Sequence, residues 1–272
     1  MKKGLLQLIF IFFTIGFFQS QYTRFVYQVS MKQDSTNRGE VKTERARLDV
    51  AQNQSFFYGE NRIKRDSVLE RMRATRNFDR NTMQNLRTAI DYVVEKDFSQ
   101  NKVVYKGRIG RDVYEYEEDR SMIWKILPET IKIGTYETQK AETVFAGRKW
   151  YAWFTQEIPF QDGPYKFKGL PGLIIKVEDS RGDYSFDLMQ TTKTEQLPNL
   201  ENRTPPIKVK RKEFEKQEKL FRDDPVSFVT NSFSQIGIGV RFQQADPSDR
   251  KRMEDRIKED IRKSNNPIEL EN

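Results

Sequence analysis

The 272-residue sequence contains no cysteine and no histidine. Without thiols or imidazoles, the chain cannot build a disulfide framework, a Cys/His zinc site, a haem or iron–sulfur centre, or a Ser-His-Asp or Cys-His relay. Any catalysis would have to use carboxylates, lysine, tyrosine or hydroxyl groups. We expect no cofactor and no metal site. The absence of cysteine suits a secreted or periplasmic protein that avoids oxidation chemistry.

A concentrated run of one charge is also missing. The chain has 48 Lys+Arg against 40 Asp+Glu, a formal charge of +8, and basic and acidic residues alternate along it. The densest basic run, residues 208–222, contains three glutamates. A nucleic-acid binder concentrates its cations on one face because phosphate neutralisation supplies its affinity. We therefore expect no nucleic-acid partner.

Residues 1–20 have the pattern of a secretory signal peptide. Two lysines precede an apolar run from Leu5 to Phe18, and a polar exit follows. The run is shorter than the roughly 20 residues that a membrane-spanning helix needs. We expect cleavage after Ser20 and an exported chain, periplasmic or secreted, with no transmembrane segment. The alternative is an uncleaved N-terminal anchor.

Short alternating segments dominate the rest of the sequence. In residues 22–31, Phe25, Tyr27 and Val29 fall on one side of a strand, with mostly polar residues on the other. Similar segments recur at close spacing up to residue 190, which favours antiparallel hairpins because parallel neighbours need long crossovers. The expected fold is mainly β: an antiparallel curved sheet or open barrel, formed by residues 21–272 as a single domain.

Three helical segments interrupt or follow these strands. A polar excursion at residues 59–86 contains a short helix that Asp66 could cap. Residues 210–222 form a second helix. A C-terminal helix is expected at residues 246–264, where Asp246 can cap it and Pro247 suits the first helical position.

The most distinctive segment is residues 163–176, which reads GPYKFKGLPGLIIK. Pro171 and Gly172 suit the second and third positions of a type II turn over residues 170–173. The apolar run from Leu173 to Ile175 then favours a strand that is buried on both faces. The residues Gly169, Leu170, Pro171, Gly172, Leu173 and Ile174 are accordingly interpreted as a structural motif.

This hexapeptide and its surroundings resemble the GLPGLI family. The resemblance extends over residues 135–179, including Gln139-Lys140-Ala141, Ala152-Trp153-Phe154-Thr155 and Ile158-Pro159, and returns at Asn266-Pro267-Ile268-Glu269. One departure is Thr138, where many members of that family carry a cysteine. The resemblance implies an exported protein of Bacteroidetes-type bacteria with unknown biochemical role, and it supplies no catalytic residue.

Aromatic residues of this region are the candidate ligand-binding residues. Trp150 and Trp153 lie three apart, which places them on opposite faces of a strand, while Tyr165 and Phe167 precede the Pro171 turn. One interpretation is an aromatic-lined cavity for an acyl chain, a peptide or a sugar. The other, which we favour from the sequence, is ordinary core packing.

Charged residues offer weaker candidates. Glu115 and Glu117 share one strand face, as a glycosidase acid–base pair or a calcium site would require, although exposed glutamate pairs on strands are common. Lys140 and Arg148 could hold an anionic ligand, but structural ion pairs are the simpler interpretation. We assign no catalytic residue.

These observations favour a non-catalytic accessory or binding protein of the cell envelope, with a hydrophobic ligand or an outer-membrane or envelope protein as its partner. Two alternatives stay open. One is a carboxylate-dependent hydrolase, and the other is a structural interaction protein that pairs through a sheet edge.

Overall fold

The computed structural model describes residues 22–77, 82, 86–110, 112–201, 204–228 and 246–270. The expected signal peptide at residues 1–20 lies outside them. The described chain is mainly β, as expected. The strands are β1 (Tyr22–Met31), β2 (Lys42–Val50), β3 (Gln54–Gly59), β4 (Val93–Asp97), β5 (Lys102–Ile109), β6 (Asp112–Glu117), β7 (Lys125–Ile133), β8 (Tyr136–Phe145), β9 (Arg148–Thr155), β10 (Leu173–Asp179), β11 (Tyr184–Thr194) and β12 (Ile207–Lys208), and the helices are α1 (Glu60–Thr75), α3 (Arg211–Asp223) and α6 (Pro247–Arg262).

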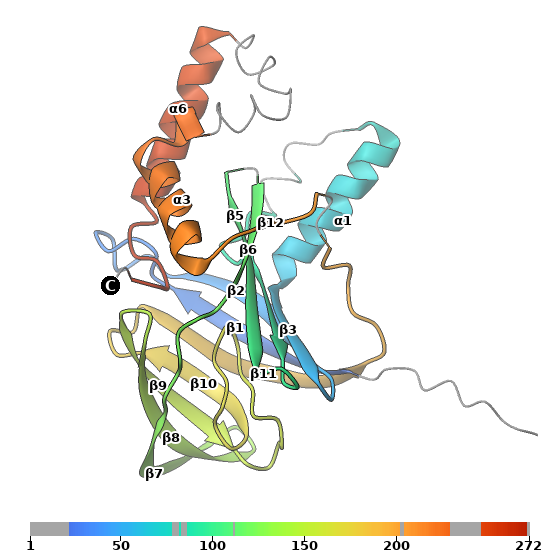
Figure 1. The fold of residues 1–272 in the computed structure, drawn as a ribbon, viewed down its shortest axis with the longest axis vertical. Helices are drawn as coiled ribbons and strands as arrows, with labels where there is room; N and C mark the ends of the chain where they lie inside the picture. The colour runs from blue at the N-terminus through green and yellow to red at the C-terminus, as the bar shows by residue number, and fades with distance from the viewer. Residues whose placement is uncertain are drawn as a thin grey trace, which may run out of the picture.

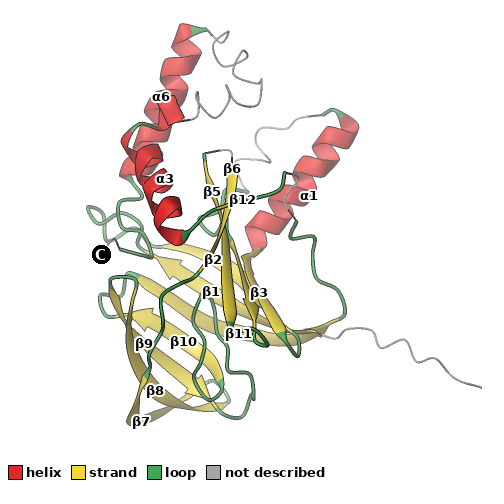
Figure 2. Cartoon of the chain, viewed as in Figure 1, coloured by secondary structure: helices red, strands yellow, loops and turns green. Residues whose placement is uncertain are grey.

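The strands form one 12-stranded sheet in the order β12-β6-β5-β4-β3-β2-β1-β11-β10-β9-β8-β7 (Figures 1 and 2). Strands β1–β6 make one antiparallel meander and β7–β11 make a second. Pairing of β1 with β11, from Tyr22↔Thr194 to Met31↔Tyr184, joins the two. Among the described strands, only the short β12 pairs parallel, with β6. The sheet is open, with β12 and β7 at its ends, and Figure 1 shows it strongly curved.

The loop between β9 and β10, residues 156–172, packs on the inner face of the sheet and completes the core. Phe167 from this loop contacts Trp150 of β9 at 4.8 Å and Phe186 of β11 at 6.1 Å between ring centroids. The hydroxyl of Tyr27 on β1 donates to the Ile174 carbonyl at 2.6 Å. The protein's own loop therefore fills the concavity that the curved sheet would otherwise present.

The bend at the hexapeptide is tighter than the expected type II turn. The Gly172 amide donates to the Leu170 carbonyl at 2.8 Å, the pattern of a γ-turn centred on Pro171, while the Leu173 amide donates to Ile158 instead. Gly172 has φ +150°, and a Cβ there would lie 2.0 Å from the Thr155 carbonyl oxygen. Close approach to the end of β9 therefore requires glycine at this position. The buried strand that follows, β10, is as expected.

Helix α1 begins earlier than expected. It starts at Glu60, directly after β3, and not near Asp66. The Glu60 carboxylate accepts from Arg47 Nε of β2 at 2.9 Å, so a contact with the neighbouring strand holds the first turn in place. Part of the expected excursion at 59–86, namely residues 78–81 and 83–85, lies outside the described residues.

The two later helices form where expected. The Asp246 side chain caps α6 by accepting from the Ser248 amide at 2.8 Å. Helix α3 is anchored by Phe214, which is buried against Tyr105 and Tyr116 at 5.6 and 5.0 Å between centroids. In Figure 1, α1 and the α3–α6 pair project from the same end of the sheet. No helix in the described part of the chain is long and apolar enough to cross a membrane.

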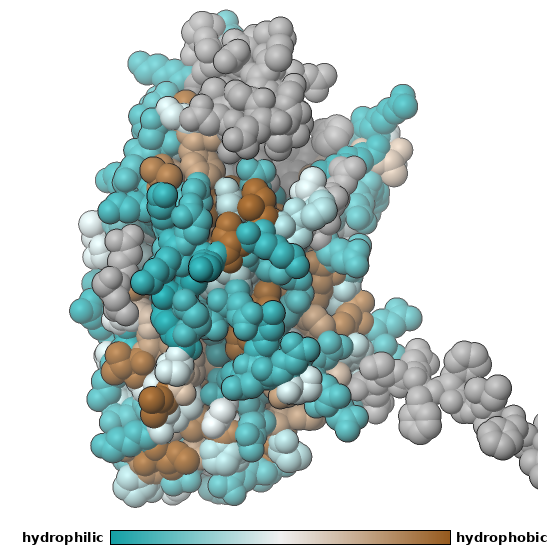
Figure 3. Space-filling model, viewed as in Figure 1, coloured by the Kyte–Doolittle hydropathy of each residue, from teal (hydrophilic) through white to brown (hydrophobic). Residues whose placement is uncertain are grey.

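Strand β7 forms one edge of the sheet and is mostly exposed. Ile126 and Ile131 on β7 and Val144 on β8 are exposed, and Figure 3 shows apolar surface at the end of the molecule that these strands form. The edge carries Pro128 inside a register shift between Ile126 and Thr130, together with two lysines. Proline, lysine and bulges are features that protect sheet edges from pairing with other chains.

Candidate functional site

The four aromatic residues predicted to bind a ligand do not form one site. Trp150, Tyr165 and Phe167 are at most 2% exposed and pack against one another in the core. Trp153 lies on the opposite face of β9, beneath the Lys140 ammonium at 5.5 Å from the ring centroid. The packing favours the core interpretation, because three of the rings have no open surface and the fourth faces away.

The predicted carboxylate pair is engaged on the surface. Glu115 lies 3.6 Å from the ammonium groups of both Lys106 and Lys208, and Glu117 lies 2.9 Å from that of Lys102. Neither glutamate lines the groove described below. The pair therefore lacks the shared cleft that acid–base hydrolysis requires.

Arg148 is a structural residue, as the simpler interpretation held. Its guanidinium is buried between Asp179 and Asp183, at 2.8 and 3.3 Å. It also donates to Asn266 Oδ1 at 2.6 Å, which ties the C-terminal segment to the sheet. Lys140 makes a looser pair with Glu129 at 3.8 Å.

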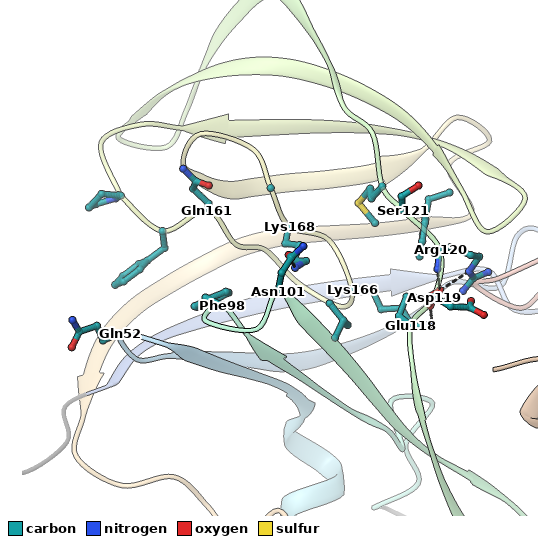
Figure 4. A pocket seen from close by; sticks show the side chains of 16 residues that line it. Gln52, Phe98, Asn101, Glu118, Asp119, Arg120, Ser121, Gln161, Lys166 and Lys168 are labelled. Carbon is teal, nitrogen blue, oxygen red and sulfur yellow. Dashed lines mark hydrogen bonds and ion pairs between the residues drawn. The ribbon is translucent and has the colours of Figure 1, made fainter. Parts of the chain in front are cut away.

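A groove of about 720 Å³ is the best candidate for a functional site (Figure 4). Its walls are the β4–β5 turn, the connection from β6 to β7 over residues 118–122, and the loop residues 159–169. Three exposed amide side chains, those of Gln52, Asn101 and Gln161, lie along it together with apolar surface from Phe98 and Phe160. The volume is within the usual range of small-molecule sites.

One end of the groove is an ion-pair network around Lys166. The buried Lys166 ammonium donates to Glu118 Oε2 at 2.7 Å, to Glu269 Oε1 at 2.5 Å and to the Tyr116 hydroxyl at 2.7 Å. It also lies 4.9 to 5.3 Å from the ring centroids of three tyrosines. Arg120 donates to both glutamates, at 2.7 and 2.8 Å.

This network holds its carboxylates in the ionised form. Burial would raise the pKa of Glu118, but hydrogen bonds and charge from Arg120 and Lys166 outweigh it and lower that pKa from 4.5 to about 2. Burial would also raise the pKa of Glu269, but the charges of Lys166 and Arg120 outweigh it, so this pKa is lowered. Neither carboxylate is poised to carry a proton near neutral pH, so the network suits binding and positioning better than acid–base catalysis.

The lowered pKa of Glu118 predicts a loss of stability in acid. A carboxylate whose folded pKa lies below its unfolded value stabilises the fold above the unfolded pKa, and this contribution disappears as the pH falls from about 4.5 to about 2. The expected loss is about 3 kcal/mol. Thermal unfolding between pH 5 and 2.5 should show a steeper decline for the wild type than for Glu118→Gln. The control is Glu117→Gln at the exposed neighbour, and a wild-type decline no steeper than that of Glu118→Gln would contradict the assignment.

A second buried lysine, Lys96, lies next to the groove and bonds to residues of the loop that forms its wall. Lys96 of β4 is fully buried and donates to Asp162 Oδ1 at 2.5 Å and to the carbonyls of Gly163 and Phe167 at 2.6 and 3.1 Å. Burial lowers the pKa of Lys96, and Asp162 opposes that shift. These three bonds attach the loop to the inner face of the sheet.

Lys168 lies beside them and faces the groove. Its ammonium donates to Asn101 Oδ1 at 2.5 Å, and its carbonyl accepts from the Trp124 indole at 2.9 Å. Burial lowers the pKa of Lys168, and the charge of Asp162 opposes the shift. Within the described residues, no group of three or more acidic side chains is arranged to hold a metal ion.

Sequence reasoning missed the lysines that define the groove. In the 163–176 segment, Lys166 and Lys168 alternate with Tyr165 and Phe167. This alternation was the available signal that the lysines lie close to the aromatic core. In a loop, however, alternation does not fix the direction of a side chain. Lys166 lies beside Glu118 and Glu269, and Lys168 beside Asn101, all from distant parts of the chain. Glu269 lay within the C-terminal part of the family resemblance, but its partners are about 100 or more residues away.

Comparison with known proteins agrees with the fold and leaves the chemistry open. A family model described as "Protein of unknown function (Porph_ging)" matches residues 143–176, the stretch from the end of β8 to β10. A search of curated proteins finds no match.

Two solved structures of PNGF-II, in space groups P21 and C2, resemble this fold with a TM-score of 0.51 each, at 16% and 17% sequence identity. The similarity covers 72% of this chain and 33% and 32% of theirs, so the chain spans about a third of the length of these structures. At this identity the likeness shows a shared curved β fold alone.

Proposed function

We propose that the protein is a non-catalytic binding module of the cell envelope, and that the groove between the β4–β5 turn and residues 159–169 holds a polar ligand. The proposal rests on how the acidic groups and the amide groups are distributed along the groove. Its acidic groups are committed to ion pairs around Lys166, whereas the amides of Gln52 and Gln161 remain exposed beside apolar surface. Such a surface can bind without reacting.

Export and membership of a GLPGLI-type family are part of this proposal. They rest on the signal-like residues 1–20, on the hexapeptide at 169–174 and on its ordered neighbours. The family-model match at residues 143–176 includes the hexapeptide and is compatible with that assignment. The PNGF-II structures, in which a similar fold is about a third of a longer chain, support the idea of a module.

The ligand that we propose is polar, and not the hydrophobic one that the aromatic residues suggested. Phe167 and Tyr165 occupy the inner face of the sheet, so an acyl chain would have to displace the loop that Lys96 holds. An outer-membrane or envelope protein remains a suitable partner if it presents a polar segment.

Both alternatives have less support. A carboxylate-dependent hydrolase needs two carboxyl groups that converge on a substrate, whereas Glu115 and Glu117 pair with surface lysines and Glu118 is held ionised. A protein that pairs through its sheet edge needs a regular edge, whereas β7 is interrupted at Pro128.

Blocking the groove should abolish binding. Gln161 is exposed on the groove wall, so Gln161→Trp is expected to fill the groove while leaving the melting temperature nearly unchanged. Native mass spectrometry of the protein purified from its own envelope should show a retained ligand on the wild type and none on this variant. Gln156→Trp, an exposed position outside the groove, is the matched control. Equal ligand retention by Gln161→Trp and wild type would contradict the proposed site.

A further inference from the structure

Lys168 in the groove and the buried pair Lys96–Asp162 next to it together carry one more positive charge than negative charge. Lys96 and Lys168 lie close enough for the charge of Lys168 to lower the pKa of Lys96, and Asp162 is the carboxylate that acts on both. Lys96 forms an ion pair with the Asp162 carboxylate at 2.5 Å and donates its other two hydrogen bonds to backbone carbonyls. Lys168 has an amide oxygen, that of Asn101, as its hydrogen-bond partner.

The other cations at the groove all have acidic partners. Around Lys166, both Lys166 and Arg120 pair with Glu118 and Glu269, and Arg211 pairs with Asp119 and Glu215. Among the described residues, no carboxylate lies within 4.0 Å of the Lys168 ammonium. The surplus charge therefore belongs to Lys168.

Lys168 is half-buried, so its charge is partly removed from water. An anion brought to it would gain more than at an exposed lysine, because attraction between charges grows as the local dielectric constant falls. The nearby amides extend the site. Gln52 and Gln161 each offer a donor and an acceptor, and Asn101 offers its amide N–H donors, which match the C=O and N–H groups of a peptide backbone.

We infer that the groove binds an extended acidic peptide segment, with a side-chain carboxylate on Lys168 and the peptide backbone along the amides. A carboxylate fits better than a phosphate monoester, because its single charge matches the one ammonium of Lys168, whereas a phosphate carries about −1.5 to −2 and Arg120 is already shared between Glu118 and Glu269. The apolar surface of Phe98 and Phe160 accommodates a neighbouring side chain. This inference rests on the proposed binding function and adds the ligand class.

Three labelled peptides test the charge preference. They are fluorescein-tagged dodecapeptides of alternating Glu and Ser, Gln and Ser, or Lys and Ser, titrated with the full protein at low salt and followed by anisotropy. The wild type should bind the Glu peptide at least about tenfold more tightly than the Gln peptide, which corresponds to one charge-assisted contact. Lys168→Gln should remove that preference, Lys168→Arg should keep most of it, and Lys168→Glu should transfer it to the Lys peptide.

The control for net charge is Lys132→Glu on the exposed edge strand β7, which changes the total charge by the same amount and should keep the wild-type preference. Equal affinity of the wild type for all three peptides, or no binding of the Glu peptide at about 1 mM, would overturn the inference. So would an unchanged preference in Lys168→Glu.

Polygalacturonate provides a second source of carboxylates. If it binds in a Lys168-dependent manner and the Glu peptide does not, the ligand is an acidic polysaccharide and the peptide assignment is wrong. The proposed function is judged separately, by whether Gln161→Trp removes the ligand retained on the protein from the envelope. If the wild type shows no preference for the Glu peptide but Gln161→Trp still removes the retained ligand, only the acidic nature of the ligand is refuted.

Discussion

Replacement of Gly172 by alanine is expected to destabilise the protein by about 3 kcal/mol, the sum of two effects. The residue has φ +150°, which costs an L side chain about 1 kcal/mol. The added Cβ would also lie 2.0 Å from the Thr155 carbonyl oxygen and 2.6 Å from its carbon, both backbone atoms that cannot move alone. For a chain of this size the melting temperature should fall by about 6 to 12 °C.

Gly169→Ala in the same hexapeptide is the matched control. Gly169 has φ +91°, but nothing lies within 4 Å of the position that a Cβ would take. Only the conformational cost of about 1 kcal/mol should appear. Thermal unfolding of both variants separates steric conflict at the end of β9 from conformational strain, and equal losses for the two would show that the close contact with Thr155 does not matter.

Replacement of Lys96 by methionine should have a still larger effect, about 3 to 5 kcal/mol. The variant removes an ammonium that is 0% exposed and leaves the buried Asp162 carboxylate and two carbonyls without their donor. The double variant Lys96→Met/Asp162→Asn should recover part of the loss, because it leaves no unpaired buried charge. Chemical denaturation of the wild type, the single variant and the double variant measures their free energies of unfolding on one scale.

The exposed pair Lys102–Glu117 is the control for this prediction. Its atoms are 2.9 Å apart, nearly as close as those of Lys96 and Asp162, but its side chains are 38% and 58% exposed. Lys102→Met should therefore cost about 0 to 1 kcal/mol. If Lys96→Met were no more costly than Lys102→Met, Lys96 could not be what attaches the 156–172 loop to the sheet.

Both predictions also concern the positions of the lysines that line the groove. Gly172 allows the end of the loop to pass against Thr155 of β9 as it enters β10, and Lys96 attaches the loop to β4. Lys166 and Lys168 lie on that loop, so their positions in the groove depend on both. A destabilised loop should weaken ligand binding without any change to a residue that touches the ligand.

Much of the secondary structure could be predicted because its causes are local. The alternation of Phe25, Tyr27 and Val29 predicts a buried face for β1, and these residues are indeed buried, whereas Gln28 on the other face is exposed. Asp246 caps α6 through the Ser248 amide only two residues away. The hairpin between β10 and β11 closes through Gly182 at φ +63°, a conformation that glycine adopts without steric cost.

Elements that depend on distant partners were predicted less well. Helix α1 starts at Glu60 because Arg47 of another strand holds that carboxylate, a contact that no local pattern reveals. The turn at Pro171 is tighter than type II because the Leu173 amide donates to Ile158. In both cases the local preference allowed several answers, and a tertiary contact selected one.

The order of amino acids by itself determined that this is a cysteine-free and histidine-free chain of short alternating strands, with a glycine-dependent bend before a core strand. Only the tertiary structure decided which loop fills the concave face of the sheet and which lysine of that loop has no carboxylate partner. The physical reason is distance along the chain. Lys96 and Asp162 are 66 residues apart and Lys168 and Asn101 are 67 apart, so their pairing exists only once the two meanders have joined through β1 and β11.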